Sequence, residues 1–172
     1  ILSGAADELK VLAEKGGIPV AATLLGLPAF PHKHRLFAGM LGMHGNYAPN
    51  VLTNQADLII AVGMRFDDRV TGNLKKYAPD ARIIHIEIDK AEINKNVRVD
   101  LEINNDAREV LAALTPLIRQ GSREKWIREF RILDRVENEK VIKPETEPEE
   151  GEIRMGEVVK TVSDLTEGDA VI

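Results

Sequence analysis

The chain has 172 residues, of which 44% are hydrophobic and 30% charged, so it is long enough for one folded domain or for one domain plus a fragment. Its net charge of −5 and the lack of a clustered Lys/Arg stripe argue against a nucleic-acid partner. The sequence has no cysteine, which excludes disulfides and thiolate metal sites, and no apolar run that approaches the roughly 20 residues of a membrane span.

The chain begins with a predicted helix and a predicted strand. Ser3 is a candidate helix cap, apolar residues recur at helical spacing after it, and Gly16-Gly17 ends the helix. The apolar run IPVAAT, residues 18–23, favours a buried strand. Because Gly and Pro recur from Leu24 to about Tyr47, we expect a long loop there.

Three further strands are predicted at residues 56–63, 81–89 and 99–104, with a charged loop and a short helix between the first two. Strands that alternate with helices indicate an α/β fold with a parallel sheet and helices on both faces. Right-handed crossovers then place the carboxyl ends of all strands along one edge of that sheet.

Two helices are predicted after the fourth strand. Asp106 and Glu109 form a start that resembles a capping box, and an apolar stripe follows them at helical spacing. Ser122 begins a second amphipathic helix, which we expect to end near Ile142.

The end of the chain differs in composition from the rest. Residues 143–152 contain two prolines and five glutamates and are predicted to be an interdomain linker. Apolar residues from Met155 to Leu165 predict one more helix, and residues 168–172 open a strand. Because residue 1 is Ile and this strand is cut off at Ile172, we interpret the chain as a fragment of a longer protein.

A binding site is predicted at the carboxyl ends of the strands, where open parallel sheets bind their ligands. That edge corresponds to residues 24–47, 64–72, 87–96 and 104–106. The unusual residues of this sequence fall in the same four segments, which is the main argument for a site.

The first two segments each allow two interpretations. Residues 39–45, GMLGMHG, have glycines at three-residue spacing that allow close approach to a flat or phosphorylated ligand. The alternative is a tight loop whose Met40, Leu41 and Met43 pack into the core. Residues 63–72, GMRFDDRVTG, are either a solvated loop that pairs its own charges or a polar wall whose Arg residues clamp phosphate or carboxylate.

The other two segments contribute carboxylates. His85 and Glu87 interrupt an otherwise apolar strand, so Glu87 either binds a ribose diol or lies on a wet edge strand. Helix capping explains Asp106, and a second role at the ligand stays open. His32 and His34 have no partner ligands at plausible spacing, so no metal site is predicted.

Four blocks of this sequence resemble the middle domain of acetolactate synthase large subunits, which are thiamine-diphosphate enzymes. The blocks are GIPVAATLLGLPAFP (17–31), GMLGMHGNYAPN (39–50), ADLIIAVGMRFDDRVTGNL (56–74) and ARIIHIEIDKAEINKN (81–96). The match runs from Ile1 to about Leu117, and its RFDDRVTG and GMLGMHG runs are specific to this family among thiamine-diphosphate enzymes. Residues 152–172 resemble the opening of the family's carboxy-terminal domain, which binds the thiamine diphosphate.

The resemblance implies a Rossmann-like, three-layer α/β domain with about six parallel strands, of which the first, with its Gly-rich turn, would lie just before Ile1. It implies a central FAD-binding domain at 1–142, a linker at 143–153 and the start of the next domain at 154–172. The glutamate that activates thiamine and the magnesium motif of this family would lie outside these residues, so no catalytic residue and no metal ligand is expected in the chain.

The resemblance also implies that the domain holds extended FAD, which is structural in this family and not needed for net redox chemistry. By the family pattern the flavin is lined by Thr23, Leu24, Leu25, Leu41, Gly42, Met43, His44, Gly63, Arg65, Asp67, Asp68, Arg69, Val70, Glu87, Ile88, Asn105 and Asp106. Met43, Asp68 and Arg69 would also face the substrate channel, in which the second 2-keto acid docks.

The implied reaction is the decarboxylation of pyruvate and the ligation of its two-carbon unit to a second 2-keto acid, in branched-chain amino-acid biosynthesis. Arg69 would clamp a carboxylate. The parent would use thiamine diphosphate and Mg²⁺, would be a cytoplasmic homo-oligomer with a small regulatory subunit, and the fragment alone would be inactive. Neither a nucleic acid nor a membrane is expected as a partner.

The sequence departs from the family pattern at a few turns. Pro28, Asn94 and Asn105 stand where glycine is usual, and Glu87 replaces Asp. Asn tolerates left-handed backbone better than other residues with a Cβ, so both Asn turns can form. Two other hypotheses remain: the central domain of another thiamine-diphosphate carboligase, such as glyoxylate carboligase, or a stand-alone nucleotide-binding or protein-interaction module.

Overall fold

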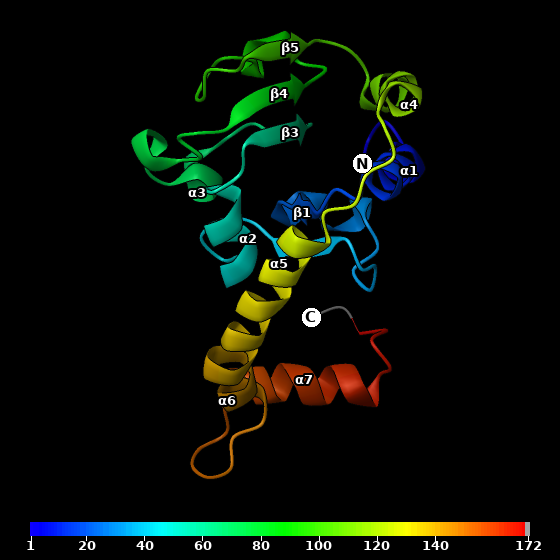
Figure 1. Ribbon diagram of the computed structural model, residues 1–172. Coiled ribbons are helices and arrows are strands. Elements are labelled where there is room, and N and C mark those ends of the chain that lie inside the picture. Colours follow the sequence, from blue (N-terminus) through cyan, green and yellow to red (C-terminus); the bar gives the residue numbers. More distant parts are fainter. Residues whose placement is uncertain (171–172) are drawn as a thin grey trace. The chain divides into compact units, whose positions relative to one another are not determined.

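The structure, a computed structural model, describes residues 1–170 and falls into two compact units, Ile1–Phe130 and Arg131–Ile172 (Figure 1). The first unit contains, in chain order, α1 (Ala6–Gly16), β1 (Val20–Ala22), the 3₁₀ helix η1 (Leu24–Ala29), β2 (Phe37–Met40), α2 (Tyr47–Thr53), β3 (Leu58–Val62), α3 (Asp68–Thr71), η2 (Leu74–Lys76), β4 (Arg82–Ile86), η3 (Lys90–Glu92), β5 (Leu101–Ile103) and α4 (Ala107–Leu117). Helix α5 (Glu124–Glu137) begins in the first unit and ends in the second.

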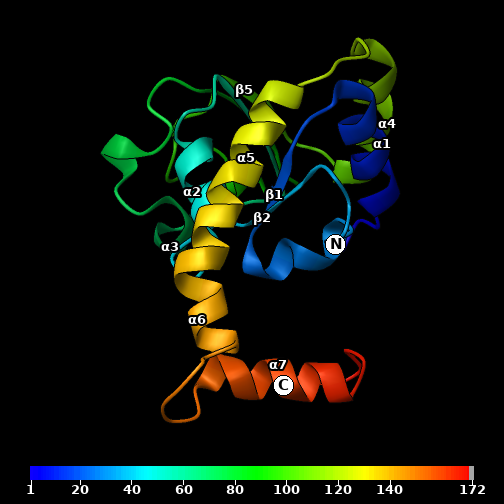
Figure 2. The same ribbon diagram turned by 60° about the horizontal axis from the view of Figure 1, so that its bottom comes forward.

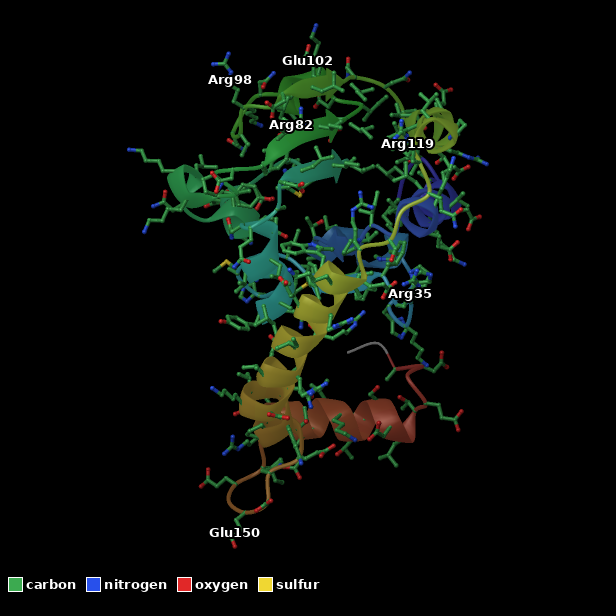
Figure 3. The ribbon with its side chains drawn as sticks, in the orientation of Figure 1. Arg35, Arg82, Arg98, Glu102, Arg119 and Glu150 are labelled. Carbon is green, nitrogen blue, oxygen red and sulfur yellow. The ribbon has the colours of Figure 1, made fainter. Side chains whose placement is uncertain are left out.

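The strands form two parallel sheets, which confirms the α/β class. β1 pairs with β2, and β3, β4 and β5 form a three-stranded sheet in that order. β4 is therefore the central strand of its sheet. At β5, Figure 3 shows the side chains of Arg98 and Glu102 pointing away from the body of the unit, so charges border this edge strand.

The strands of the described residues form two sheets, and the expectation of a long loop from Leu24 to Tyr47 is wrong. That segment contains η1, β2 and the start of α2. β2 reads FAGM, which is too short and too rich in small residues to show the alternation that marks a strand. It forms because Val20 N–H donates to the Leu36 carbonyl and Leu41 N–H to the Ala22 carbonyl, both at 2.8 Å.

Apolar side chains cover both faces of the three-stranded sheet, as expected for a layered, Rossmann-like fold. Ile60 and Val62 of β3 pack in one cluster with residues of α1 and α4, whereas Ile59 and Ala61 pack in another with Phe66. The helices α1 and α4 lie side by side in both ribbon views (Figures 1 and 2). This period of two along β3 buries the strand on both sides.

Local signals predict the helix ends well, with one exception. Gly17 adopts the left-handed conformation (φ +61°) that ends α1, and Asp106 caps α4, as predicted. Ser3 does not cap α1, because Ala5 is the cap residue and makes no side-chain bond. Residues 1–4 instead form a separate turn that the Gly4 N–H closes on the Ile1 carbonyl at 2.9 Å.

The second unit is helical in its described part. After α5 come a π turn, η4 (Asn138–Ile142), the short α6 (Lys143–Thr146) and α7 (Met155–Leu165). The predicted helix at 155–165 is confirmed, but α6 shows that the first residues of the predicted linker are helical. The strand expected at 168–172 extends beyond the described residues. The domain limits at 142 and 153 stay a prediction.

Within residues 1–170, no helix is both long and apolar enough to cross a lipid bilayer.

Candidate functional site

The segments that follow the strands lie at the carboxyl edge of each sheet. In the two-stranded sheet, Thr23 follows β1 and Leu41 follows β2. The turn after β2 also reaches the other sheet, because Met43 N–H donates to the Arg69 carbonyl at 2.7 Å. This hydrogen bond links two segments that the sequence separates by more than twenty residues, and it joins two of the predicted site segments.

In the three-stranded sheet, hydrogen bonds connect the residues just beyond each strand. Gly63 N–H donates to the Ile86 carbonyl at 2.9 Å, and Glu87 N–H donates to the Ile103 carbonyl at 3.1 Å. The side-chain amide of Asn104 then donates to the Glu87 carbonyl at 2.9 Å. The edge is therefore continuous from β3 through β4 to β5.

Two asparagines hold the turn after β2 in shape. Asn50 accepts from Gly42 N–H at 3.0 Å and donates to the Gly42 carbonyl at 2.9 Å. Asn46 accepts from Met40 N–H at 2.9 Å. Because these side chains replace backbone partners, the turn from Leu41 to His44 is fixed without regular secondary structure.

The glycines of this turn allow close approach, but the approaching group is the protein's own backbone. Gly42 has φ +102°, and a Cβ there would lie 2.7 Å from the Arg69 carbonyl oxygen. A Cβ at Gly45 would overlap the Met40 carbonyl. The alternative that Met43 packs into the core is wrong, because Met43 is 69% exposed.

The segment after β3 combines the two interpretations left open for it. Arg65 and Asp67 form a loose ion pair at 3.7 Å, as a self-paired loop would. Asp67 also caps α3 by accepting from Arg69 N–H at 3.1 Å. The side chains of Asp68 and Arg69 are exposed, and no ion pair joins them to another residue in the described part of the chain. They are therefore available to a charged ligand.

Glu87 is buried at the end of the central strand, with 7% of its surface exposed. The alternative of a wet edge strand is therefore wrong. One carboxylate oxygen, Oε1, accepts from Asp89 N–H at 3.1 Å, which fixes the side chain beside its own turn. The neighbouring Ile88 is exposed.

Asp106 caps α4, accepting from Arg108 N–H at 2.8 Å and from Glu109 N–H at 3.4 Å. Asn105 accepts from Asp106 N–H at 2.7 Å and has no positive φ, so the expected left-handed turn is wrong there. Asn94 does adopt it, with φ +60°. Its backbone conformation matches the glycine that the resemblance expected at this position.

All of the predicted site residues lie in these strand-end segments. Neighbouring segments are joined directly, but within residues 1–170 no hydrogen bond joins Thr23 or His44 to Glu87 or Asp106. The edge also exposes large apolar side chains, namely Leu24, Leu25, Met43 and Ile88. The arrangement thus offers apolar surface, cations and carboxylates along one edge of the sheets.

The sequence interpretation missed the asparagines that shape this edge. Besides Asn46, Asn50 and Asn104, Asn96 donates to the Arg65 carbonyl at 3.2 Å and supports the segment after β3. The signal was present for Asn46, Asn96 and Asn104, since Asn side chains commonly bond to backbone in turns and these three lie outside helices and strands, whereas Asn50 lies in α2. Their partners, however, lie at distances in sequence that no local pattern specifies.

Two other features involve none of the proposed site residues. A cavity of about 460 Å³ lies between α1 and η1, lined mainly by apolar residues that include Leu27, Phe30 and Phe37. None of the charged residues of the strand-end segments lines it. Within residues 1–170 no group of three or more His, Asp or Glu side chains could hold a metal ion. His34 instead contacts the Glu14 carboxylate at 3.0 Å.

Residues 1–114 match the family described as "Thiamine pyrophosphate enzyme, central domain".

Three similar proteins are described as acetolactate synthase large subunits. The chain is 41% identical to the "Acetolactate synthase isozyme 3 large subunit" of Escherichia coli over 100% of its own length and 30% of that protein. It is 46% identical to the "Probable acetolactate synthase large subunit" of Methanocaldococcus jannaschii over 84% of the chain and 26% of that protein. It is 41% identical to the Lactococcus lactis "Acetolactate synthase large subunit" over 99% of the chain and 29% of that protein. The chain thus spans less than a third of these relatives.

Proposed function

The chain belongs to the thiamine pyrophosphate enzyme family, whose central domain it matches, and from this premise we propose that it serves as the central domain of an acetolactate synthase large subunit. The observation that supports this most strongly is the alignment of the whole chain with the Escherichia coli protein at 41% identity. The activity of such a protein is the decarboxylation of pyruvate and the ligation of its two-carbon unit to a second 2-keto acid. Thiamine pyrophosphate, when bound, supplies the electron sink for that chemistry.

We propose that the strand-end edge holds FAD. A flavin needs an apolar surface for its flat ring, and the exposed Leu25 and Met43 can provide it. Its diphosphate needs cations, which Arg65 and Arg69 can provide, and a ribose needs an acceptor such as the Glu87 carboxylate. The residues present therefore fit this cofactor. The other members of the site would be those of the family pattern, from Thr23 to Asp106.

Arg69 is the residue we propose to face the 2-keto acid. Its side chain is exposed and lies outside any ion pair in the described part of the chain, and its backbone N–H donates to Asp67, the cap of α3. A guanidinium in this position can bind a carboxylate through two parallel hydrogen bonds. Met43, whose N–H binds the Arg69 carbonyl, and Asp68 would lie beside the same channel.

The remaining parts of the proposal concern the parent protein. It would be a cytoplasmic homo-oligomer that works with a small regulatory subunit in branched-chain amino-acid biosynthesis and uses Mg²⁺. The central domain would contribute no residue to the thiamine activation itself. Its tasks would be to place the flavin and to line the channel through which the second 2-keto acid enters.

A domain exchange tests this proposal. Residues 1–172 would replace the matched segment of the Escherichia coli isozyme 3 large subunit, and acetolactate formation from pyruvate would be measured with bound FAD quantified in parallel. We expect the chimera to bind FAD and to form acetolactate, with the unmodified Escherichia coli subunit as the positive control.

The 172-residue chain by itself should form no acetolactate, because thiamine activation requires the other domains. Acetolactate from the isolated chain would contradict the domain assignment. A chimera that folds and retains thiamine pyrophosphate but binds no FAD would contradict the flavin site, and one that binds both and stays inactive would contradict the assigned family member.

A further inference from the structure

His85 is a fully buried histidine without a hydrogen bond. It lies in the central strand β4, is 0% exposed, and neither Nδ1 nor Nε2 has a hydrogen-bond partner in the described structure. Buried polar side chains are normally hydrogen-bonded, so an imidazole that is not requires an explanation. The proposed function gives His85 no role, since His85 is not among the proposed site residues.

The imidazole packs against Phe66. The two ring centroids lie 5.1 Å apart with an interplanar angle of 82°, an edge-to-face contact. Phe66 makes a second contact of this kind with Tyr77, at 6.1 Å and 78°. Tyr77 is also buried, and its hydroxyl likewise has no hydrogen-bond partner among residues 1–170. Phe66 is therefore held between two polar rings, which act on it through packing and not through hydrogen bonds.

Phe66 also has an unusual backbone conformation, which the packing of these rings can explain. Its φ is +54°, a left-handed conformation that a bulky residue rarely adopts, and only 2% of its surface is exposed. It lies between Arg65 and Asp67, so its conformation sets the direction in which the segment after β3 leaves the sheet. A strained conformation persists only where the surroundings enforce it.

We propose that His85 is a positioning residue of the site, whose neutral ring holds Phe66 in its left-handed conformation and thereby orients the segment from Arg65 to Arg69. The role of that segment in binding rests on the proposed function, whereas the positioning itself does not. His85 acts through Phe66 and touches no ligand.

The charge state of His85 is part of this role. Burial lowers the pKa of His85, and this outweighs the Met64 backbone and the carboxylates of Glu87 and Glu92, which raise it. Glu102 lies opposite His85 in the register of β4 and β5, and its side-chain oxygen Oε2 accepts a hydrogen bond from Asn94. Burial also raises the pKa of Tyr77 to about 12, so the neighbouring ring is neutral as well.

The lowered pKa of His85 determines how the stability of the fold changes with pH. A histidine whose pKa is lower in the folded state than its ordinary 6.5 binds fewer protons when folded than when unfolded. Its contribution to stability is complete above 6.5 and is lost as the pH falls from there toward the folded-state pKa. Acid would therefore loosen the Phe66 contact first and the segment behind it next.

Three variants of the full 172-residue chain test the proposal. His85→Phe keeps a ring and cannot be protonated, His85→Leu keeps apolar volume without a ring, and His85→Ala removes both. We expect His85→Phe to be as stable as the parent at about pH 7.5 and to lose the fall in stability between about pH 6.5 and pH 5 in urea unfolding. We expect His85→Leu to fold and to shift the amide NMR resonances of residues 65–69.

His34 supplies the matched control. It also makes an edge-to-face contact, with Phe30 at 5.1 Å and 85°, but its Nε2 is bonded to Glu14. His34→Phe should leave the resonances of residues 65–69 unchanged. In the chimera, His85→Leu should weaken FAD binding by about tenfold or more, and His85→Phe should restore it.

The outcomes separate this inference from the proposed function. Unchanged resonances of residues 65–69 in His85→Leu would overturn the positioning role. So would a His85→Phe variant as unstable as His85→Ala, because hydrogen bonds of the ring nitrogens would then matter. If the resonances shift and the chimera binds no FAD at all, the positioning role stands and the flavin site fails.

Discussion

Gly42 is the residue at which the turn after β2 comes closest to the segment after β3. A Cβ there would lie 2.7 Å from the Arg69 carbonyl oxygen, the same oxygen that accepts the Met43 N–H. The φ of +102° adds a second barrier to any side chain. We therefore expect Gly42→Ala to lower the free energy of unfolding by about 2 kcal/mol or more, measured by urea unfolding of the 172-residue chain.

Gly63→Ala is the control that isolates the backbone contribution. Gly63 also has a left-handed backbone, with φ +60°, but apart from its chain neighbours no atom of the described residues lies within 4 Å of a Cβ placed there. Only the conformational cost of about 1 kcal/mol should appear. If Gly42→Ala and Gly63→Ala lose the same free energy of unfolding, the Arg69 backbone can move away from the added Cβ at no cost. The contact between the two segments would then not contribute to stability.

Single residues are predictable from sequence where their partners are local. Gly17 and Asp106 act on their own helix ends, and Asn94 adopts the left-handed backbone expected of a residue in a glycine position. Glu87 differs, because it is buried at the end of a strand that lies between two others, an arrangement that its sequence neighbours do not specify. The sequence suggested a carboxylate of interest there but could not decide between a buried and a wet position.

At the scale of elements, the start of α4 tests whether Asp106 has one role or two. Its carboxylate accepts from the N–H groups of Arg108 and Glu109. Asp106→Ala should lower the free energy of unfolding by about 1 kcal/mol, because both donors lose their acceptor. Asp106→Asn keeps a capping oxygen and should cost only a few tenths of a kcal/mol, measured by thermal or urea unfolding.

The same pair of variants separates capping from ligand binding in the chimera. If Asp106 also contacts the adenosine half of FAD, Asp106→Asn should weaken FAD binding while stability stays nearly unchanged. If both variants bind FAD as the parent does, Asp106 is a helix cap alone and leaves the list of proposed site residues.

Elements with a strong period were predicted, and those without one were not. β3 is apolar over all five residues, β4 is apolar except for Arg82 and His85, and α7 repeats its apolar residues at helical spacing, so their sequences specify them. β2 reads FAGM, which has no clear apolar period, and this strand forms because it pairs with β1. Most of the candidate edge could be located from the sequence because β3, β4 and β5 were located, whereas the turn at Leu41–His44 needed β2.

At the scale of the whole first unit, each of the two sheets consists of parallel strands, and in the described residues no strand pairing connects one sheet to the other. In the described residues, β1 pairs only with β2, and β3 pairs only with β4. In Figure 1, β1 lies beyond β3 on the side away from β4 and β5. Leu9 of α1 packs in the clusters of both sheets, so one helix contacts both. The free edges of β1 and β3 are exposed to pairing by another strand.

The common strand order of doubly wound sheets explains this division. That order is 3-2-1-4-5-6, and removal of its first strand leaves a pair, 3-2, and a triplet, 4-5-6. β2-β1 and β3-β4-β5 have this arrangement. We therefore expect one additional parallel strand to lie between β1 and β3, and the turn after it to border the site proposed for the FAD diphosphate, as helix and strand ends do for phosphates.

An extended chain tests this expectation at the scale of the molecule. The segment that precedes the matched region in the Escherichia coli relative would be joined to Ile1, with a matched control that carries Pro in the middle of the added strand, where it removes a sheet hydrogen bond. The extended chain should unfold at higher urea than the 172-residue chain, because the strand pairs with both free edges, and the Pro control should lose most of that gain. It should also bind FAD, measured by quenching of flavin fluorescence, where the 172-residue chain binds weakly or not at all. Tight FAD binding by the 172-residue chain would show that the strand and its turn are dispensable, and equal stability of the extended chain and its Pro control would place the added segment outside the sheet.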